Sequence, residues 1–204
     1  MMIDHLIYAA PDLTAAVADL EDRFGVRAQA GGRHPGLGTH NALLALGPRT
    51  YLEIIAADPG RPGPSVHHLF AAGDLACSAL VGWALTCDDI DQAVAGARSR
   101  GYDPGEIGDG QRVASAGTVL RWRATGSRPA DDLVPFLISW GDTEHPARSA
   151  PPGLSLMSLR IEHPDPPSLT PALMALGAGI DVTPAAAPAL VATLTGPAGT
   201  TVLR

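Results

Sequence analysis

Three segments of this chain repeat one plan, and that repetition constrains its fold more than any single motif. Each copy opens with an apolar stretch of strand character: IDHLIYAA near the start, LVGWALTC in the middle and LSLMSLRIEH later. An acidic or proline-containing helix start follows, then apolar residues at helical spacing, then a glycine. The plan predicts one strand–helix unit used three times.

The ends of the three predicted helices carry the residues that such ends favour. Asp12, Asp88 and Asp165 stand where a side-chain oxygen can cap free backbone N–H groups and oppose the helix dipole. Glycine adopts the left-handed conformation after a helix at little cost. It follows each helix in turn, as Gly25, Gly101 and Gly177.

Short strand candidates follow each helix and complete the repeated unit. In the first copy, HNALLALG and TYLEIIAAD flank a Gly-Pro-Arg turn, which is typical of a hairpin. We therefore predict an α+β fold of repeated βαβββ modules. The modules are expected at residues 1–58, 81–141 and 154–204, with linkers at 59–80 and 142–153. A short helix is expected around residues 67–75.

Charge and hydropathy narrow the class of partner. A net charge of −7 argues against a nucleic-acid partner and favours a small organic molecule. No apolar run is long enough for a membrane span, and the start lacks the basic region of a signal peptide.

The two cysteines, Cys77 and Cys87, are too few for a disulfide framework. We therefore expect both to be small buried side chains of a protein in a reducing cytoplasm.

His5 and Glu53 each interrupt a strand that is otherwise apolar. Burying either side chain alone costs several kcal/mol unless a partner satisfies it. Strand alternation places His5 with its apolar neighbours at positions 3 and 7, and Glu53 with those at 51 and 55. Each ionisable side chain therefore lies on a defined face of its strand and needs a partner there.

The βαβββ plan, with DHL opening the chain and GTHNALLALGPRTYLEIIAADP continuing it, resembles the vicinal oxygen chelate superfamily. Within that superfamily it is most similar to glyoxalase-like domain proteins, well over residues 1–145 and at module level over 154–204. The resemblance implies that two modules pair their curved sheets into a cup, which commonly holds a divalent metal ion. It implies that His5 is the first-strand metal ligand and Glu53 the fourth-strand carboxylate ligand.

The second module departs from that pattern. Gly82 aligns with His5, and the strand LVPFLISW contains no Glu, Asp or His. His40, His67, His68 and His145 are the candidates for a third ligand, and no spacing selects one. The alternative is a hydrogen-bonded His5–Glu53 pair with no metal, because stable catalytic sites generally use three protein ligands.

Four further residues are candidates for substrate binding near the mouth or wall of the cup. His40 and Asn41 follow the glycine-rich loop GGRHPGLGT and would form a pocket rim, or else a polar cap on an edge strand. Arg121 and Arg123 share one face of a strand and could clamp a substrate carboxylate, or else form a solvated face.

Two tryptophans complete the set. Trp83 and Trp140, on the first and last strands of the second module, could wall the cup with aromatic surface or could pack in the core.

The apolar strands of the third module need a cover, either from the rest of the chain or from a second copy. A homodimer is the expected outcome.

The resemblance implies a small-molecule enzyme of glyoxalase (lyase) or dioxygenase type. In that chemistry a metal ion chelates adjacent substrate oxygens and stabilises developing negative charge. Glu53 would be a ligand or the proton-transfer base, and His5 a ligand or an electrophile. The alternative is a metal-free binding protein of the bleomycin-resistance kind, which sequesters an aromatic or cationic compound. A weaker third possibility is an interaction protein whose cup has closed.

Overall fold

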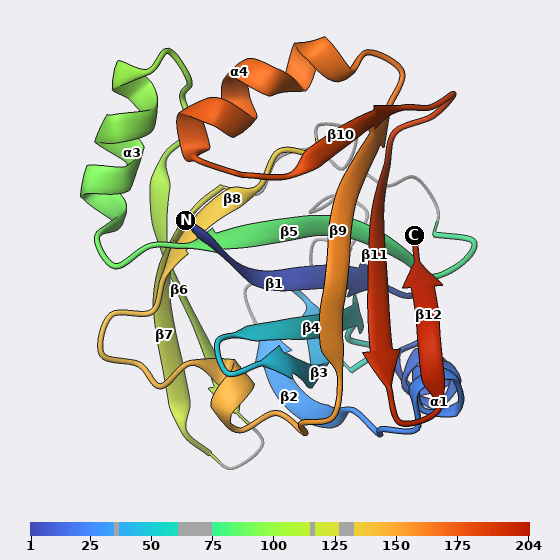
Figure 1. Ribbon diagram of the computed structural model, residues 1–204. Coiled ribbons are helices and arrows are strands. Elements are labelled where there is room, and N and C mark those ends of the chain that lie inside the picture. Colours follow the sequence, from blue (N-terminus) through green and yellow to red (C-terminus); the bar gives the residue numbers. More distant parts are fainter. Residues whose placement is uncertain (35–36, 61–74, 115–116, 127–132) are drawn as a thin grey trace.

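The computed structural model describes residues 1–34, 37–60, 75–114, 117–126 and 133–204 (Figure 1). His67, His68 and most of the short helix expected around residues 67–75 lie outside these described residues. Among the described residues the strands form two groups: one closed barrel and one separate four-stranded sheet.

The first unit contains the elements β1 (Met2–Ala9), α1 (Leu13–Phe24), β2 (Gln29–His34), β3 (Thr39–Gly47) and β4 (Thr50–Ala57). Helix α1 begins as predicted, since the Asp12 side chain accepts a 2.8 Å hydrogen bond from the Ala15 N–H. It ends at Gly25, which has a left-handed φ of 75°.

The second unit contains β5 (Ala79–Thr86), α3 (Ile90–Ser99), β6 (Ile107–Ala114), β7 (Val119–Thr125) and β8 (Phe136–Ser139). The cap of α3 is Asp89 and not the predicted Asp88, because the Asp89 carboxylate accepts the Gln92 N–H at 3.0 Å. Adjacent aspartates make this one-residue shift invisible to sequence spacing.

The third unit follows a short 3₁₀ helix, η1 (Pro146–Arg148), and contains β9 (Ser155–His163), α4 (Pro166–Leu176), β10 (Asp181–Pro184), β11 (Ala189–Gly196) and β12 (Gly199–Leu203). Its element order is again strand–helix–strand–strand–strand, but its strands pair differently. The sheet runs β10-β9-β11-β12, whereas the first unit runs β1-β4-β3-β2. The module boundaries inferred from the sequence stay a prediction.

The barrel joins the first two units edge to edge, in the order β1-β4-β3-β2-β6-β7-β8-β5. Strands β1 and β5 pair antiparallel at one seam, and β2 and β6 pair at the other. Two curved sheets paired in this way form the predicted cup, so the predicted fold class is confirmed.

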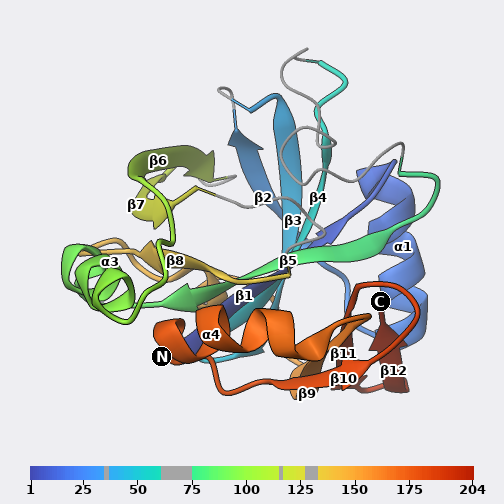
Figure 2. The same cartoon turned by 90° about the horizontal axis from the view of Figure 1, so that it is seen from above.

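The core lies between the outer face of the barrel and the third unit. Leu6 and Leu52 on the barrel belong to the same buried cluster as Leu190 and Leu194 of β11. Figure 2 shows the third sheet and α4 together along one side of the barrel. The apolar face of the third sheet is thus covered within the chain. The homodimer stays a prediction that this face no longer supports.

The structure also bears on two further sequence expectations, the burial of the cysteines and the lack of a membrane span. Cys77 is exposed and Cys87 half-buried, both with free thiols, so the expectation that both are buried is wrong for Cys77. In the described part of the chain, no helix has the length and apolar character needed to cross a bilayer.

Candidate functional site

The inner face of the barrel encloses a cavity of about 630 Å³, and His5 and Glu53 both line it. Strands β1 and β4 pair in parallel, with His5 opposite Tyr51 and Ile7 opposite Glu53. Side chains at alternate positions of both strands therefore point inward together. The pair of ionisable side chains lies on neighbouring strands, as the resemblance implied for the first and fourth strands of the module.

A buried carboxylate holds His5 in place. Asp4 accepts three hydrogen bonds, from His5 Nδ1 at 2.7 Å, from Trp140 Nε1 at 3.1 Å and from His145 Nε2 at 3.1 Å. Burial alone would raise the pKa of Asp4, but the hydrogen bonds from His145 and His5 outweigh burial and bring it well below its usual range. Asp4 is therefore an anion at the base of the site.

These hydrogen bonds assign the ring protons, because an ionised carboxylate only accepts. The proton on Nδ1 of His5 faces Asp4, which leaves Nε2 facing the cavity and 3.9 Å from Glu53 Oε2. In His145, Nδ1 accepts the Ala147 N–H at 3.2 Å, and Nε2 donates to Asp4. Both nitrogens of His145 are thus engaged within the protein.

The second carboxylate oxygen of Glu53, Oε1, accepts a hydrogen bond from the protein. The Asn41 amide donates to Glu53 Oε1 at 2.5 Å, and the Glu53 side chain is 12% exposed. His34 Nε2 lies 3.9 Å from the same oxygen. Burial lowers the pKa of His34; the nearby Glu53 opposes this shift, and Arg112 adds to it. Glu53 therefore has a histidine beside each carboxylate oxygen.

Aromatic side chains form much of the cavity wall. The Tyr51 ring stacks on the His5 imidazole with centroids 4.7 Å apart, and burial raises the pKa of the Tyr51 phenol well above its usual value. Trp122 and Trp140 lie 5.4 Å apart at a tilt of 54°. Phe136 contacts the edge of His5 at 5.5 Å. The wall can therefore hold a flat or apolar molecule against the pair.

Trp140 lines the cavity and Asn41 lies buried behind it on Glu53, but Trp83 lies elsewhere. Trp83 is paired in register with Leu6, whose side chain faces outward into the core, while Gly82 is paired with the inward-facing Ile7. The Trp83 indole N–H donates to the Leu133 carbonyl at 2.8 Å. Its place in the core corrects the expectation that it walls the cup.

Arg121 and Arg123 share a face of β7, as predicted, but that face points away from the barrel cavity. Arg123 forms an exposed two-point ion pair with Asp91 of α3. Trp122 between them lines the cavity instead. The arginine that lines the cavity is Arg112 on β6, which the sequence did not single out.

His40, a sequence candidate, lies outside the cavity, whereas His34, which the sequence did not single out, lines it. His40 is half-buried, does not line the cavity and precedes the inward-facing Asn41 on β3. His34 is buried beside Glu53, at the end of a β2 strand that glycines made look like a loop. Strand alternation through residues 31–34 was the one sequence signal that could have placed His34 in the site.

The described residues contain no set of three ligands for the divalent metal ion that the resemblance implies. No group of three or more His, Cys, Asp or Glu side chains in that part of the chain could hold a metal ion. Both nitrogens of His145 are engaged, and His40 points elsewhere. His5 Nε2 and His34 Nε2 each lie 3.9 Å from a different Glu53 oxygen but do not form such a group, whereas catalytic zinc sites use three protein ligands. The residues described do not fit a resident metal.

The fold and site define a barrel of two paired βαβββ units around a small-molecule cavity. The glyoxalase-like domain matches residues 3–177, and the chain belongs to that family. A search of curated proteins finds no match.

One solved structure shares the fold over most of the chain. A hypothetical protein from Staphylococcus aureus is 12% identical, with a TM-score of 0.69, over 92% of this chain and 87% of that chain. A methylmalonyl-CoA epimerase from Mycobacterium tuberculosis is 20% identical, with a TM-score of 0.45, over 70% of this chain and 88% of its own. These likenesses concern the fold alone.

Proposed function

We propose that this protein is a small-molecule enzyme that transfers a proton at a carbon next to a carbonyl group, with Glu53 as base and His5 as electrophile. One observation carries the proposal. Two proton-transfer groups face one cavity 3.9 Å apart, and the far side of each is fixed, His5 by Asp4 and Glu53 by Asn41. Fixed geometry of this kind is what general acid–base catalysis requires.

The proposed step balances within these residues. The Glu53 carboxylate takes the proton from the carbon, and the electron pair moves onto the carbonyl oxygen. The His5 imidazolium donates from Nε2 to that oxygen while Nδ1 donates to Asp4. The Asp4 carboxylate stabilises the imidazolium, as the buried aspartate of a catalytic triad does. Return of the proton from Glu53 to the same carbon, while the enol oxygen gives its proton back to His5 Nε2, restores the carbonyl group and both residues.

The donor set favours the glyoxalase-like, proton-transfer branch of the family over the dioxygenase branch. Oxygen chemistry in this fold needs a redox metal on several protein ligands, and the described residues supply no such set. No step above passes through a metal ion. A divalent metal stays a prediction of the resemblance.

The second candidate function is metal-free binding of an aromatic or cationic compound. The tilted pair Trp122 and Trp140, with Tyr51 and Phe136, supports it, because aromatic faces hold flat and cationic ligands. In that case the His5–Glu53 pair would orient a ligand and perform no chemistry. The cytoplasmic location and the homodimer stay predictions under either function.

Proton transfer can be tested without knowing the natural substrate. Protein purified without a chelator or a metal-binding tag is analysed for metal, given a glyoxalase assay, and incubated in D₂O with a panel of ketones and 2-oxo acids. We expect deuterium uptake next to the carbonyl by protein that lacks stoichiometric metal. Absence of uptake across the panel, together with tight binding of an aromatic cation, would establish the binding function instead.

A further inference from the structure

We infer that the cavity takes a small organic carboxylate whose anionic group pairs with Arg112. This inference rests on the proposed function and names its substrate class. The ligand would carry its carboxylate at Arg112, its carbonyl beside His5 and Glu53, and an apolar body against the aromatic wall.

Arg112 is a buried charge without a counter-ion. It is 4% exposed, and it forms no ion pair with any carboxylate in the described part of the chain. Its one described hydrogen bond runs from Nη1 to the Gly31 carbonyl. A guanidinium has five N–H donors, and an unpaired buried charge costs several kcal/mol. The remaining donors therefore call for an anion that the chain itself does not supply.

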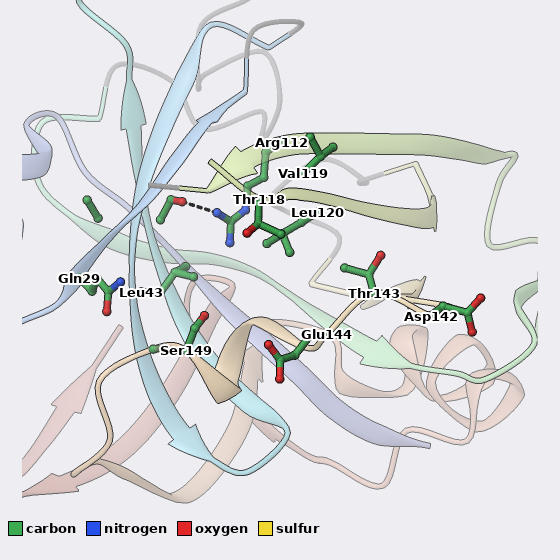
Figure 3. A pocket seen from close by; sticks show the side chains of 13 residues that line it. Gln29, Leu43, Arg112, Thr118, Val119, Leu120, Asp142, Thr143, Glu144 and Ser149 are labelled. Atoms are coloured by element: carbon green, nitrogen blue, oxygen red, sulfur yellow. Dashed lines mark hydrogen bonds between the residues drawn. The ribbon is translucent and has the colours of Figure 1, made fainter. Parts of the chain in front are cut away.

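The position of Arg112 makes it reachable. Its side chain lines the barrel cavity and also a second hollow of about 370 Å³, which Leu43 and Leu120 line as well. Figure 3 shows the guanidinium in that hollow, between Leu43 and Leu120, with its single hydrogen bond to the backbone. Arg112 thus borders both the barrel cavity and the second hollow, and a ligand can approach it from within the barrel.

Arg112 and the proposed catalytic pair belong to one electrostatic site. Burial lowers the pKa of His34 and raises that of Tyr51; the charge of Arg112 adds to the first shift and opposes the second. These two side chains border Glu53 and His5, and Arg112 lines the same cavity. Glu53 is not the missing counter-ion, because its oxygen is held by Asn41 and it makes no ion pair with Arg112. An anionic ligand would therefore lie close to the groups that move the proton.

The charge count favours a carboxylate over a phosphate. Arg112 is the one Lys or Arg among the described residues that line the barrel cavity, and Glu53 there is acidic. A singly charged carboxylate matches one guanidinium fork bidentately, whereas a phosphate dianion would face the same acid with one cation. Ile7, Ile55 and Phe136 line the remaining space and favour an apolar body.

A pair of probes tests the inference: 2-oxo-4-phenylbutanoate, and 4-phenyl-2-butanone, in which a methyl group replaces the carboxylate. Ligand-observed NMR on the wild type should show roughly tenfold or greater preference for the 2-oxo acid, as a charge-assisted bidentate pair requires. Arg112→Gln should abolish that preference. Arg121→Gln, the matched change on the outer face of β7, should leave it intact.

Arg112→Lys is a second variant that keeps the test decisive if Arg112→Gln fails to fold. It keeps the positive charge but loses the planar fork, so it should retain part of the preference. Equal affinity of the wild type for both probes, persistence of the preference in Arg112→Gln, or no binding of the 2-oxo acid would each overturn the inference.

Failure of the inference can be told apart from failure of the proposed function by following deuterium uptake in the same samples. Uptake that is equal in both probes and lost in Glu53→Gln would overturn the carboxylate site and leave proton transfer standing. Arg112-dependent binding of the 2-oxo acid without uptake would overturn proton transfer and leave the carboxylate site standing.

Discussion

Nδ1 of His5 lies 2.7 Å from Oδ1 of Asp4, so two consecutive residues of one strand form a buried aspartate–histidine pair. Consecutive strand residues normally point to opposite faces. Here the pairing of β1 with β5 shifts register between Ile3 and His5, which marks a bulge and lets both side chains serve one site. Asp4 is thus a positioning residue that acts through His5.

Replacing Asp4 should therefore alter chemistry more than binding. In Asp4→Asn the amide can accept from fewer of the three donors, and it no longer stabilises an imidazolium at His5. We expect kcat for deuterium exchange to fall by roughly a hundredfold or more, with KM little changed. A fall in kcat/KM that comes from KM alone would assign Asp4 to ligand binding instead.

The same residue predicts a pH dependence of stability. Because the folded-state pKa of Asp4 lies below its unfolded value of about 3.8, its contribution is fully present above that value and is lost as pH falls toward the folded-state pKa. Wild type should exceed Asp4→Asn in unfolding free energy at neutral pH. The difference should shrink between about pH 4 and the acid limit of the folded state. Denaturant titrations at several pH values measure it, and a difference independent of pH would contradict the assignment.

Gly110 should control the position of the Trp122 indole. A Cβ atom added at Gly110 would lie 2.3 Å from Trp122 ring atoms, so Gly110→Ala must displace the ring. We expect a changed tryptophan emission spectrum and weaker binding of flat probes. Gly108→Ala on the same strand is the matched control, since a Cβ there meets nothing within 4 Å. Equal effects of the two variants would show that only backbone entropy is involved.

The third unit should stabilise the barrel as part of one core. Leu194 of β11 is fully buried in the cluster it shares with Leu6 and Leu52, so Leu194→Ala should cost about 2–5 kcal/mol in one cooperative transition. Val202→Ala on the half-exposed face of β12 should cost less than about 1 kcal/mol. Two separate unfolding transitions in the wild type would contradict a shared core.

Much of the fold could be read from the sequence because helix ends and strand alternation are local signals. The run from Asp12 to Gly25 defines α1, and strand alternation together with the family resemblance placed His5 and Glu53 at one site. The strand order of the third sheet could not be read in this way, because element order does not determine which edge a strand joins.

The rest of the site depends on relations that no local pattern carries. Arg112 faces inward because of its place in β6, and it meets Gly31 only across the seam with β2. His145 reaches Asp4 from 141 positions away. Trp83 points outward because of its register with Leu6. Each of these facts is set by pairing between distant strands.

The central claim is that Glu53 is a base in the cavity and not a structural partner of His5. Glu53→Gln keeps the shape and an acceptor for Asn41 while removing the charge. The most direct measurement is deuterium exchange into 2-oxo-4-phenylbutanoate by Glu53→Gln beside its thermal melting curve. The account predicts that exchange is lost while the melting temperature is equal to or higher than that of the wild type. A variant destabilised by about 3–5 kcal/mol, the cost of breaking a buried ion pair, whose folded fraction still catalyses exchange at the wild-type rate would contradict it.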